Sequence, residues 1–597
     1  MKMEFDPEGY QPPRAGIILL YACVAVLFVI FLLRFWYLQV LHGANYARQA
    51  QENRLRIERI YANRGLIFDR NGHIVAENRP AYCLAVTADE CPDLATSLAQ
   101  ISQWTDVPAE QLEARYRQAR SKNAKSFESI ILVADIPFEA LARIETELPD
   151  WPGISIVTRQ RRHYPQGTLF SHILGYVAEA GDKDLEIDKD LDLGDIVGKQ
   201  GLEFKMEKNL RGGKGLQELE VDAKGRQLTK TVRNSSIGGK NITLALDLDI
   251  QQAASAALGE EAGSIVVMEP DTGKLVALLT KPAFDNNAFA ARLTFKEWEE
   301  LRTNPRHPLL NRGIQSVYPP GSVWKLMMAG LVLSEGINPK ETINCAGSVQ
   351  LGNHTFRCWR AGGHGRVDLK QSLVQSCDVY YYLMAERIGI DKLAAFAKQC
   401  GFGNITGIDL PHEQRGLVPD RVWRRARGEA WQKGETLNVS IGQGSTLVTP
   451  IQLATFVSAL LNGGKKMKPS LIADAEPEIR GELPLSEEAR QFIIHAMRET
   501  AETGTAKRIA RPDAIMGGKT GTAQVVKIGD VRLKTHQMAY EHRDHAWIAT
   551  WGMKNGKTYV VIVMLEHGGG GSSSAGPLAV AMYNKLFGPI PIRTAGR

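Results

Sequence analysis

The stretch YPPGSVWKLM, residues 318–327, places two prolines and a glycine directly before Ser322 and a lysine three residues after it. Proline and glycine disfavour a helix, whereas the apolar residues of 326–332 recur at helical spacing until Gly336. The pattern therefore predicts a helix that begins at Ser322. Residues three apart share one face, so the Lys325 amine can reach the Ser322 hydroxyl, as a base reaches a nucleophile. The alternative is that Ser322 only caps the helix and Lys325 is a solvated side chain.

Two further motifs have the residue types and the order that such a pair needs. QSCDVYYYLMA, residues 375–385, places Ser376 and Asp378 at the start of a second apolar helical run. GGKTGTA, residues 517–523, is predicted to be a strand, and it carries Lys519, Thr520, Gly521 and Thr522. Each motif alone also fits a helix cap or a glycine-interrupted strand. Together, in the order S-x-x-K, S-x-D, K-T-G, they match the signature of serine acyl enzymes that recognise penicillin.

Composition limits the remaining possibilities. With 597 residues, of which 44% are hydrophobic, the chain is long enough for several domains with large cores. Its net charge of +6 comes from 72 basic and 66 acidic residues spread along the whole chain, without a long basic run interleaved with aromatics. We therefore expect no nucleic-acid partner.

One segment is predicted to cross a membrane. Residues 15–33 contain no charged side chain and are bounded by Arg14 and Arg34, which is about the length of a membrane-spanning helix. The bulky RFWYL that follows, residues 34–38, does not resemble a signal-peptide cleavage site, so we interpret the segment as an uncleaved anchor. Basic residues lie on both sides of the span, so their distribution does not indicate its orientation.

The rest of the chain divides into two predicted parts. Residues 35 to about 240 mix short strand signals, including a hairpin at Asn71-Gly72, with polar connections and no cluster of catalytic groups. Beyond Asn241, strands precede and follow a central helical block, with hairpins at 270–273 and 555–556, which predicts a mainly antiparallel sheet covered by helices. The predicted class is therefore α+β and multidomain. Its parts are a tail (1–13), a transmembrane anchor (14–34), an elongated, mostly-β pedestal (35–240) and a catalytic domain (241–597).

Over nearly its whole length the sequence resembles the class B penicillin-binding proteins. The segments RGLIFDRNG, RHYPQGTLFSHILGY and GLEFKMEKNLRG are similar to the pedestal motifs of that family. NRGIQSVYPPGS, LNVSIGQGSTLVTPIQLA and DHAWIATW are similar to motifs of its catalytic domain. Asp378, where many relatives have Asn, and the GHG segment at 363–365 resemble the elongation-type branch, penicillin-binding protein 2.

This resemblance implies a serine β-lactamase-like transpeptidase domain and a peptidoglycan D,D-transpeptidase that acts in cell-wall elongation and rod-shape maintenance. Ser322 would attack the penultimate D-alanine of a stem peptide. Lys325 must be neutral to accept the serine proton, a form that burial and the like charge of Lys519 favour. Ser376 would relay the proton and Asp378 would orient the substrate or Lys325.

Substrate binding is expected on the predicted strand. Thr520 and Thr522, separated by Gly521, share one strand face, so both hydroxyls can hold the terminal carboxylate of the substrate beside Lys519. The backbone N–H groups of Ser322 and Thr522 are the implied oxyanion hole. Two alternatives stay open: a D,D-carboxypeptidase, in which water resolves the acyl-enzyme, and a catalytically inactive cell-wall scaffold.

The resemblance also implies partners and a location. The expected ligands are peptidoglycan stem peptides and β-lactams. A SEDS-type glycosyltransferase is expected to contact the anchor, and a rod-complex scaffold protein the pedestal. Because peptidoglycan lies outside the cytoplasmic membrane, we expect a single-pass inner-membrane protein with its catalytic domain in the periplasm.

Four possible metal ligands lie within 33 residues: Cys345, Cys358, His364 and Cys377. This set matches the tetrahedral preference of structural zinc, and some elongation-type relatives carry a ligand set in this region. The alternative is a Cys345–Cys358 disulfide, with Cys377 a packed residue and His364 an ordinary loop histidine. No cofactor is needed for the chemistry. Because Cys377 stands between Ser376 and Asp378, a metal there would anchor the catalytic loop from behind.

Overall fold

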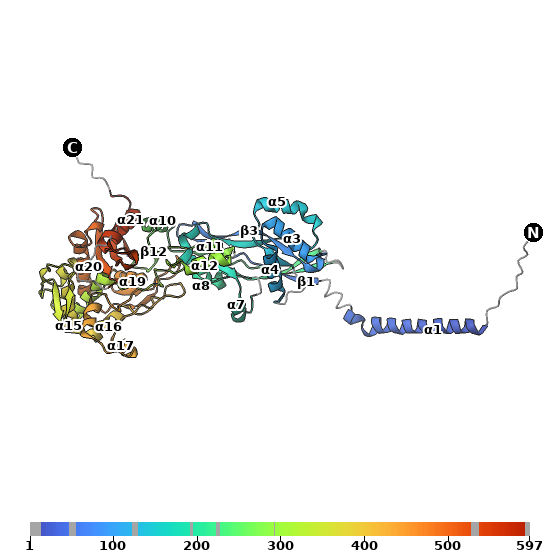
Figure 1. The fold of residues 1–597 in the computed structure, drawn as a ribbon, viewed down its shortest axis with the longest axis horizontal. Coiled ribbons are helices and arrows are strands. Elements are labelled where there is room, and N and C mark those ends of the chain that lie inside the picture. The colour runs from blue at the N-terminus through green and yellow to red at the C-terminus, as the bar shows by residue number, and fades with distance from the viewer. Residues whose placement is uncertain are drawn as a thin grey trace, which may run out of the picture. The chain divides into compact units, whose positions relative to one another are not determined.

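The computed structural model describes residues 14–46, 55–121, 129–191, 195–221, 227–291, 293–526 and 537–590 (Figure 1). The chain forms two compact units, Met1–Asn63 with Gly212–Gly238, and Arg64–Arg211 with Gly239–Arg597. The predicted tail, residues 1–13, lies outside the described residues.

The first unit contains the predicted span. Helix α1 (Arg14–Trp36) continues into a π-helical turn at Tyr37–Leu41, so the helical segment is longer than the predicted anchor. In the described part of the chain, Ala15–Leu41 is the one helix that is long and apolar enough to cross a membrane, which fits a single-pass anchor. The same unit holds an antiparallel sheet of order β1-β8-β9, formed by Leu55–Ile60, Gly215–Val221 and Gln227–Asn234.

The second unit begins with the remainder of the pedestal. The predicted hairpin at Asn71-Gly72 is confirmed, since β2 (Ile67–Phe68) pairs antiparallel with β3 (Ile74–Val86) and Gly72 has a φ of 88°. Strand β3 also pairs with β4 (Ile130–Val133) and β5 (Ile154–His163). β10 (Ile242–Thr243) pairs parallel with β2, so the chain just past the predicted boundary still belongs to this sheet, and the boundary itself stays a prediction.

Three helices of the pedestal were not predicted from the sequence. They are α3 (Leu94–Thr105), α4 (Ala109–Ser121) and α5 (Phe138–Glu147). They share a core with strands β3 to β5, in which Ile101 and Ile144 are fully buried. The shorter elements nearby are α6 (Ser171–Leu174), β6 (Val177–Glu179), α7 (Asp182–Ile187), β7 (Ile196–Gly198), α8 (Gly201–Lys205) and α9 (Glu207–Arg211).

A buried ion-pair cluster joins the three pedestal motifs. Glu203 is fully buried and accepts hydrogen bonds from Arg64 Nε and Arg162 Nε, both at 2.6 Å. Burial opposes the charged carboxylate, but the two guanidinium groups outweigh it and hold the pKa of Glu203 below its ordinary value. Each of the three residues comes from a different motif, so this cluster holds together segments that lie far apart in the sequence.

The catalytic part of the second unit is built on a five-stranded antiparallel sheet of order β12-β11-β21-β20-β19. Both predicted hairpins are confirmed. The turn at Asn555-Gly556 has φ values of 52° and 76°, as a two-residue hairpin loop of this type requires. The strands are β11 (Gly263–Met268), β12 (Leu275–Lys281), β19 (Ile515–Ala523), β20 (His545–Lys554) and β21 (Lys557–Leu565).

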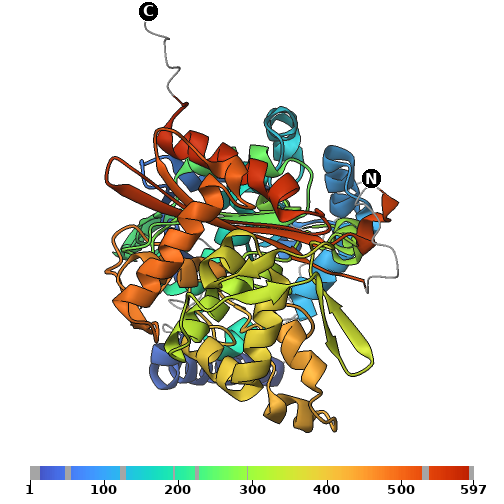
Figure 2. The same ribbon diagram turned by 90° about the vertical axis from the view of Figure 1, so that its left-hand side faces the viewer.

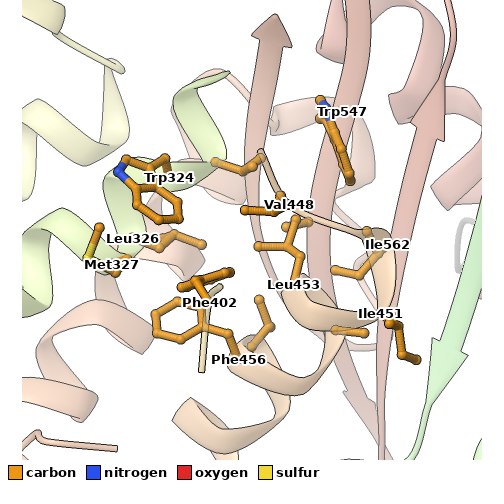
Figure 3. Packing of buried hydrophobic residues seen from close by; sticks show 14 of the residues in the cluster. Trp324, Leu326, Met327, Phe402, Val448, Ile451, Leu453, Phe456, Trp547 and Ile562 are labelled. Carbon is orange, nitrogen blue, oxygen red and sulfur yellow. The ribbon is translucent and has the colours of Figure 1, made fainter. Parts of the chain in front are cut away.

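Helices cover both faces of this sheet, as the sequence predicts (Figure 2). On one face α10 (Leu248–Leu258) and α21 (Gly576–Phe587) pack against alternate strand residues such as Ile265 and Val267. On the other, α13 (Lys325–Ser334), α15 (Asp378–Ile388) and α19 (Pro450–Leu461) share a larger core. Figure 3 shows its centre, where Trp324, Phe402 and Phe456 lie beside Leu453 of α19.

The remaining elements surround this core. The helices are α11 (Asn286–Ala290), α12 (Phe295–Thr303), α14 (Leu369–Val374), α16 (Ile390–Gln399), α17 (Arg421–Ala426), α18 (Lys433–Ser440) and α20 (Glu487–Glu502). The short strands are β13 (Ile343–Cys345), β14 (Ser348–Leu351), β15 (His354–Arg357), β16 (Gly365–Val367), β17 (Lys465–Met467) and β18 (Ile479–Glu482).

We expect Glu203→Ala to destabilise the pedestal by about 3–5 kcal/mol, because it leaves the buried Arg162 guanidinium without a carboxylate and Arg64 with Glu207 alone. Thermal unfolding of the full-length protein in detergent should show a lower midpoint. Glu300→Ala is the control, since Glu300 pairs with Lys296 at the surface, where the two side chains are 66% and 86% exposed. Equal midpoints for the two variants would contradict a stabilising role for the cluster.

Candidate active site

The Ser322 segment forms a tight turn followed by a helix. Gly321–Trp324 is a 3₁₀ turn that leads directly into α13. The predicted position of the helix is confirmed, with the difference that its first turn is 3₁₀ rather than α. Because a 3₁₀ helix has three residues per turn, Ser322 and Lys325 lie on the same side.

Glycine is required at position 321 for two reasons. Its φ is 55°, and a Cβ atom there would lie 2.5 Å from the carbonyl oxygen of Thr522 on β19. The Gly321 N–H also donates to Gly442 O at 2.8 Å. The turn that carries Ser322 is therefore held closely between β19 and the loop after α18.

Lys325 is fully buried, and Asp378 provides its opposite charge. The Lys325 amine donates to Asp378 Oδ1 at 2.6 Å and to the Ser376 carbonyl oxygen at 2.9 Å. Asp378 is the first residue of α15, and Ser376 has a φ of 57°, which turns the chain from α14 into that helix. The second carboxylate oxygen, Asp378 Oδ2, accepts from the Trp359 N–H at 2.8 Å. Both oxygens of the aspartate are thus fixed.

Lys519 brings the third motif to the same place. Its amine, also fully buried, donates to the Ser376 hydroxyl at 2.8 Å, and Lys325 Nζ lies 3.4 Å from the same oxygen. Burial and the charge of Lys325 lower the pKa of Lys519 well below its ordinary value, although Asp378 opposes this shift. The Ser376 hydroxyl therefore lies between two lysines, as a proton relay requires.

The structure does not form the predicted contact between Lys325 and the Ser322 hydroxyl. Within the described ranges, Ser322 Oγ has no hydrogen-bond partner, and the half-buried hydroxyl is left available. Lys325 bonds to Asp378 instead, because a fully buried ammonium needs a carboxylate more than a hydroxyl. Four of the five predicted catalytic residues are thus linked by hydrogen bonds, and Ser322 lies one turn away on the same helical segment.

Strand β19 presents the substrate-binding motif at an open edge. It is the last strand of the sheet, so one row of its backbone groups is not used in a ladder. Lys519 Nζ donates to Thr520 O at 3.2 Å, and Gln443 Nε2 donates to Thr522 O at 3.0 Å, so these carbonyl groups point away from β20. In an antiparallel strand the N–H and C=O of one residue point to the same side, so the Thr522 N–H also faces outward. This orientation fits the predicted oxyanion hole.

The two strand hydroxyls have different partners. Thr522 Oγ1 accepts from the Gly571 N–H at 3.4 Å, whereas Thr520 Oγ1 donates to Thr505 Oγ1 at 2.9 Å. Gly571 needs to be glycine, because a Cβ there would lie 2.3 Å from the carbonyl oxygen of Trp547. Neither Thr505 nor Gly571 was predicted from the sequence, although the glycine run at 568–571 is a signal for a close backbone approach.

Two other residues of the site were also missed. Gln443 accepts from the Gln524 N–H through Oε1, in addition to its bond to Thr522, and so ties the loop after α18 to the end of β19. Trp359 is half exposed and donates through its indole N–H to Gln375 O, beside the Asp378 carboxylate. Gln443 lies within one of the motifs quoted above, but nothing in its spacing predicted this contact.

The four predicted metal ligands come together. Cys345, Cys358, His364 and Cys377 place their ligand atoms within 4.8 Å of one another. His364 Nδ1 lies 3.6 Å from Cys345 Sγ and 3.5 Å from Cys358 Sγ. Zn–S and Zn–N bonds of about 2.3 and 2.1 Å in a tetrahedron put neighbouring ligand atoms about 3.5–3.8 Å apart, so the donor set fits zinc. All seven cysteines are free, and no disulfide joins Cys345 to Cys358.

A contact between two thiols of this cluster moves their pKa values in opposite directions. A hydrogen bond from the Cys377 thiol lowers the pKa of Cys358 to about 5, and the same contact raises the pKa of Cys377. Cys358 Sγ also accepts from the backbone N–H of Asp378 at 3.4 Å. The cluster therefore contacts the backbone of Asp378, whose carboxylate bonds to Lys325.

Two family descriptions and several known proteins match this chain. Residues 263–585 match "Penicillin binding protein transpeptidase domain", and residues 59–244 match "Penicillin-binding Protein dimerisation domain". The chain is 33% identical over 605 residues to the peptidoglycan D,D-transpeptidase MrdA of Acinetobacter baumannii, covering 98% of this chain and 90% of that protein.

Similar solved structures cover most of the chain. A complex between penicillin-binding protein PBP2 and MreC from Helicobacter pylori contains a chain with a TM-score of 0.79 and 31% identity, covering 89% of this chain and 98% of that one. A chain in a structure of a peptidoglycan synthase complex that coordinates polymerisation and crosslinking has a TM-score of 0.71 and 29% identity, covering 96% and 98%.

We expect Gly321→Ala to lower the rate at which a fluorescent penicillin labels the protein by about 100-fold, because the new Cβ pushes the Ser322 turn away from β19. The matched control is Gly336→Ala at the other end of α13. Gly336 also has a positive φ, of 72°, but no neighbouring atom lies within 4 Å of a Cβ added there. The Gly336→Ala protein should be labelled at the same rate as the unmodified protein. If both variants lose labelling rate equally, backbone strain alone explains the effect and the close contact with β19 does not.

Proposed function

This chain belongs to the class B penicillin-binding proteins of the elongation type, and we propose that it cross-links peptidoglycan through an acyl-enzyme on Ser322. It is a peptidoglycan D,D-transpeptidase, as the matched relatives are named. The observation that carries the proposal is the linked set of buried groups, Asp378, Lys325, Ser376 and Lys519, beside the turn that bears an unbonded serine hydroxyl.

The contacts of Lys325 suit the role of a base. A neutral amine has two N–H donors and one lone pair. Lys325 acts as the base in its neutral form, after its third ammonium proton has passed through the Ser376 hydroxyl to Lys519. Asp378 Oδ1 and Ser376 O then accept its two remaining donors, at 2.6 and 2.9 Å, and the lone pair takes the Ser322 proton. In the first half-reaction Ser322 Oγ bonds to the carbonyl carbon of the penultimate D-alanine while its proton passes to Lys325. The tetrahedral intermediate then expels the terminal D-alanine, whose amine takes a proton through Ser376.

The second half-reaction reverses these proton transfers. An amine from a neighbouring stem peptide attacks the ester carbonyl, its proton returns through the same groups, and Ser322 Oγ leaves as the hydroxyl. The N–H groups of Ser322 and Thr522 would stabilise both tetrahedral oxyanions, a contribution of about 3 kcal/mol per donor. Thr520, Thr522 and Lys519 would hold the donor carboxylate, while Gly521, between the threonines, lets the backbone at Pro320 pack against β19.

Location and partners follow from this chemistry. The single apolar helix fits a membrane anchor, and we infer a periplasmic catalytic domain because peptidoglycan lies outside the cytoplasmic membrane. A solved relative is bound to MreC, and another belongs to a peptidoglycan synthase complex. We propose that a rod-complex scaffold protein binds the pedestal (35–240), that a SEDS-type glycosyltransferase contacts the anchor, and that β-lactams acylate the transpeptidase domain (241–597).

We expect benzylpenicillin to acylate Ser322 alone, and Ser322→Ala to abolish the mass increase. Lys325→Ala should remove acylation, since it removes the proposed base, whereas Asp378→Asn should keep part of it, because the amide oxygen still accepts from Lys325. Intact-mass measurement and peptide mapping of the full-length protein in detergent provide the readout. Lys370→Ala, which breaks only a surface pair with Glu499, is the control. Complete loss in both Lys325→Ala and Asp378→Asn would refute the separate roles.

We also propose that Cys345, Cys358, His364 and Cys377 hold a structural zinc ion. The support is the donor set itself, with S···N distances of 3.5 and 3.6 Å and all four ligand atoms within 4.8 Å of one another. The ion would take no part in acyl transfer. It would fix the loop around Ser376 and Asp378, because Cys377 lies between them and Cys358 bonds the Asp378 N–H.

We expect protein exported to the periplasm and purified without chelator to carry about one zinc per chain. Cys345→Ser should lose the metal and lower both the thermal midpoint and the acylation rate. Cys400→Ser is the matched control, because Cys400 is an equally buried thiol of the same domain outside the cluster. Metal-free protein with a Cys345–Cys358 disulfide in non-reducing peptide maps would overturn the proposal.

A further inference from the structure

The hydroxyl of Thr520 has one partner that no motif predicts. Thr520 lies on β19 next to Lys519 and is 8% exposed. Its Oγ1 donates to Thr505 Oγ1 at 2.9 Å, and among the described residues Thr505 is the only hydrogen-bond partner of this hydroxyl. The group proposed to hold the substrate carboxylate is therefore already engaged before substrate arrives.

The backbone around Thr505 is fixed from two sides. Thr505 follows α20, and its N–H donates to Val374 O at 3.3 Å, two residues before Ser376. Next to it, the Ala506 N–H donates to Thr500 O at 3.1 Å. Gly504 packs so closely that a Cβ there would lie 2.5 Å from Val374 O. The position of the Thr505 hydroxyl is thus set by the loop, and not by its contact with Thr520 alone.

The hydroxyl of Thr522, two residues further along β19, accepts a hydrogen bond from a backbone donor. Its Oγ1 accepts from the Gly571 N–H at 3.4 Å, so its own proton remains free for an anion. A hydroxyl that accepts one hydrogen bond while it donates another is polarised, and the donated bond is strengthened. Thr520 has no backbone donor of this kind in the described part of the chain, and only the rotatable hydroxyl of Thr505 can provide one.

We propose that Thr505 is a positioning residue for the carboxylate of the acyl donor, acting through Thr520. This inference rests on the proposed function. Without substrate, Thr520 donates to Thr505. When a carboxylate enters beside Lys519, the Thr520 O–H rotates to it, and the Thr505 O–H rotates to donate to Thr520 Oγ1. Each proton stays on its own oxygen. The result is a series of hydrogen bonds from Thr505 through Thr520 to the carboxylate, analogous to the series from Gly571 through Thr522.

The test compares a substrate analogue with and without the carboxylate. The acylation rate constants of the full-length protein in detergent are measured with benzylpenicillin and with its methyl ester. Thr505→Val keeps the shape of the side chain but removes the hydroxyl. It should reduce the ratio of the acylation rate constant for the acid to that for the ester about 10-fold, chiefly by slowing acylation by the acid. Thr505→Ser should restore the preference to within about twofold, because the hydroxyl is retained.

Two controls separate positioning from folding. Thr503→Val changes an exposed threonine two residues away, whose hydroxyl bonds only to Glu499 O, and it should leave the preference unchanged. In a Thr520→Val background, Thr505→Val should have no further effect on the acid-to-ester ratio, since its route to the carboxylate is gone. Thr505→Ala provides the same comparison if the valine variant does not fold.

The outcomes are distinct. A fall in the acid-to-ester ratio with rescue by serine supports the inference. Equal slowing of both compounds, or an unchanged ratio, overturns it while acylation of Ser322 stands. Absence of acylation by benzylpenicillin in the unmodified protein would overturn the proposed function itself.

Discussion

The arrangement of the active site depends on one buried charge. The Lys325 side chain has no contact with solvent, and an amine in that position is tolerated only with a carboxylate at hydrogen-bond distance. Asp378 meets this requirement because α15 begins at that residue, directly against α13. The turn at Ser376 is the consequence, since its positive φ allows both its carbonyl and its hydroxyl to face the lysines. One ion pair thus places three of the residues proposed to act in catalysis.

Close backbone contacts complete the site on its other side. A Cβ atom added at Gly321, Gly442 or Gly571 would lie within 2.5 Å of a backbone atom of a neighbouring segment. These approaches bring the serine turn, the loop after α18 and the loop after β21 to the exposed edge of β19. The edge strand in turn offers its unpaired N–H groups to a ligand, as strands that bind peptides do. Glycine at these points is therefore a requirement of geometry.

Further hydrogen bonds support the residues proposed to act in catalysis. Cys358 accepts from the Asp378 N–H, and Trp359 holds the other end of the same residue through its carboxylate. Gln443 and Thr505 contact β19 from two different loops. Far along the chain, Glu203 holds together three pedestal motifs in the same way, by satisfying two buried guanidinium groups. Precise placement of a few side chains in this protein rests on buried polar groups that are hydrogen-bonded to partners from distant segments.

The sequence by itself determined whatever depends on neighbours along the chain. The spacing of Ser322 and Lys325, the Asn-Gly hairpins, the apolar span and the strand that carries Lys519 are all local, and the motif order sufficed to identify the family. The tertiary structure decided which groups meet. That Lys325 bonds Asp378 instead of Ser322, that Thr520 bonds Thr505, and that α3 to α5 cover the pedestal strands depend on contacts between distant segments. Local propensity carries no information about such contacts, because their free energy arises only when folding removes both partners from water.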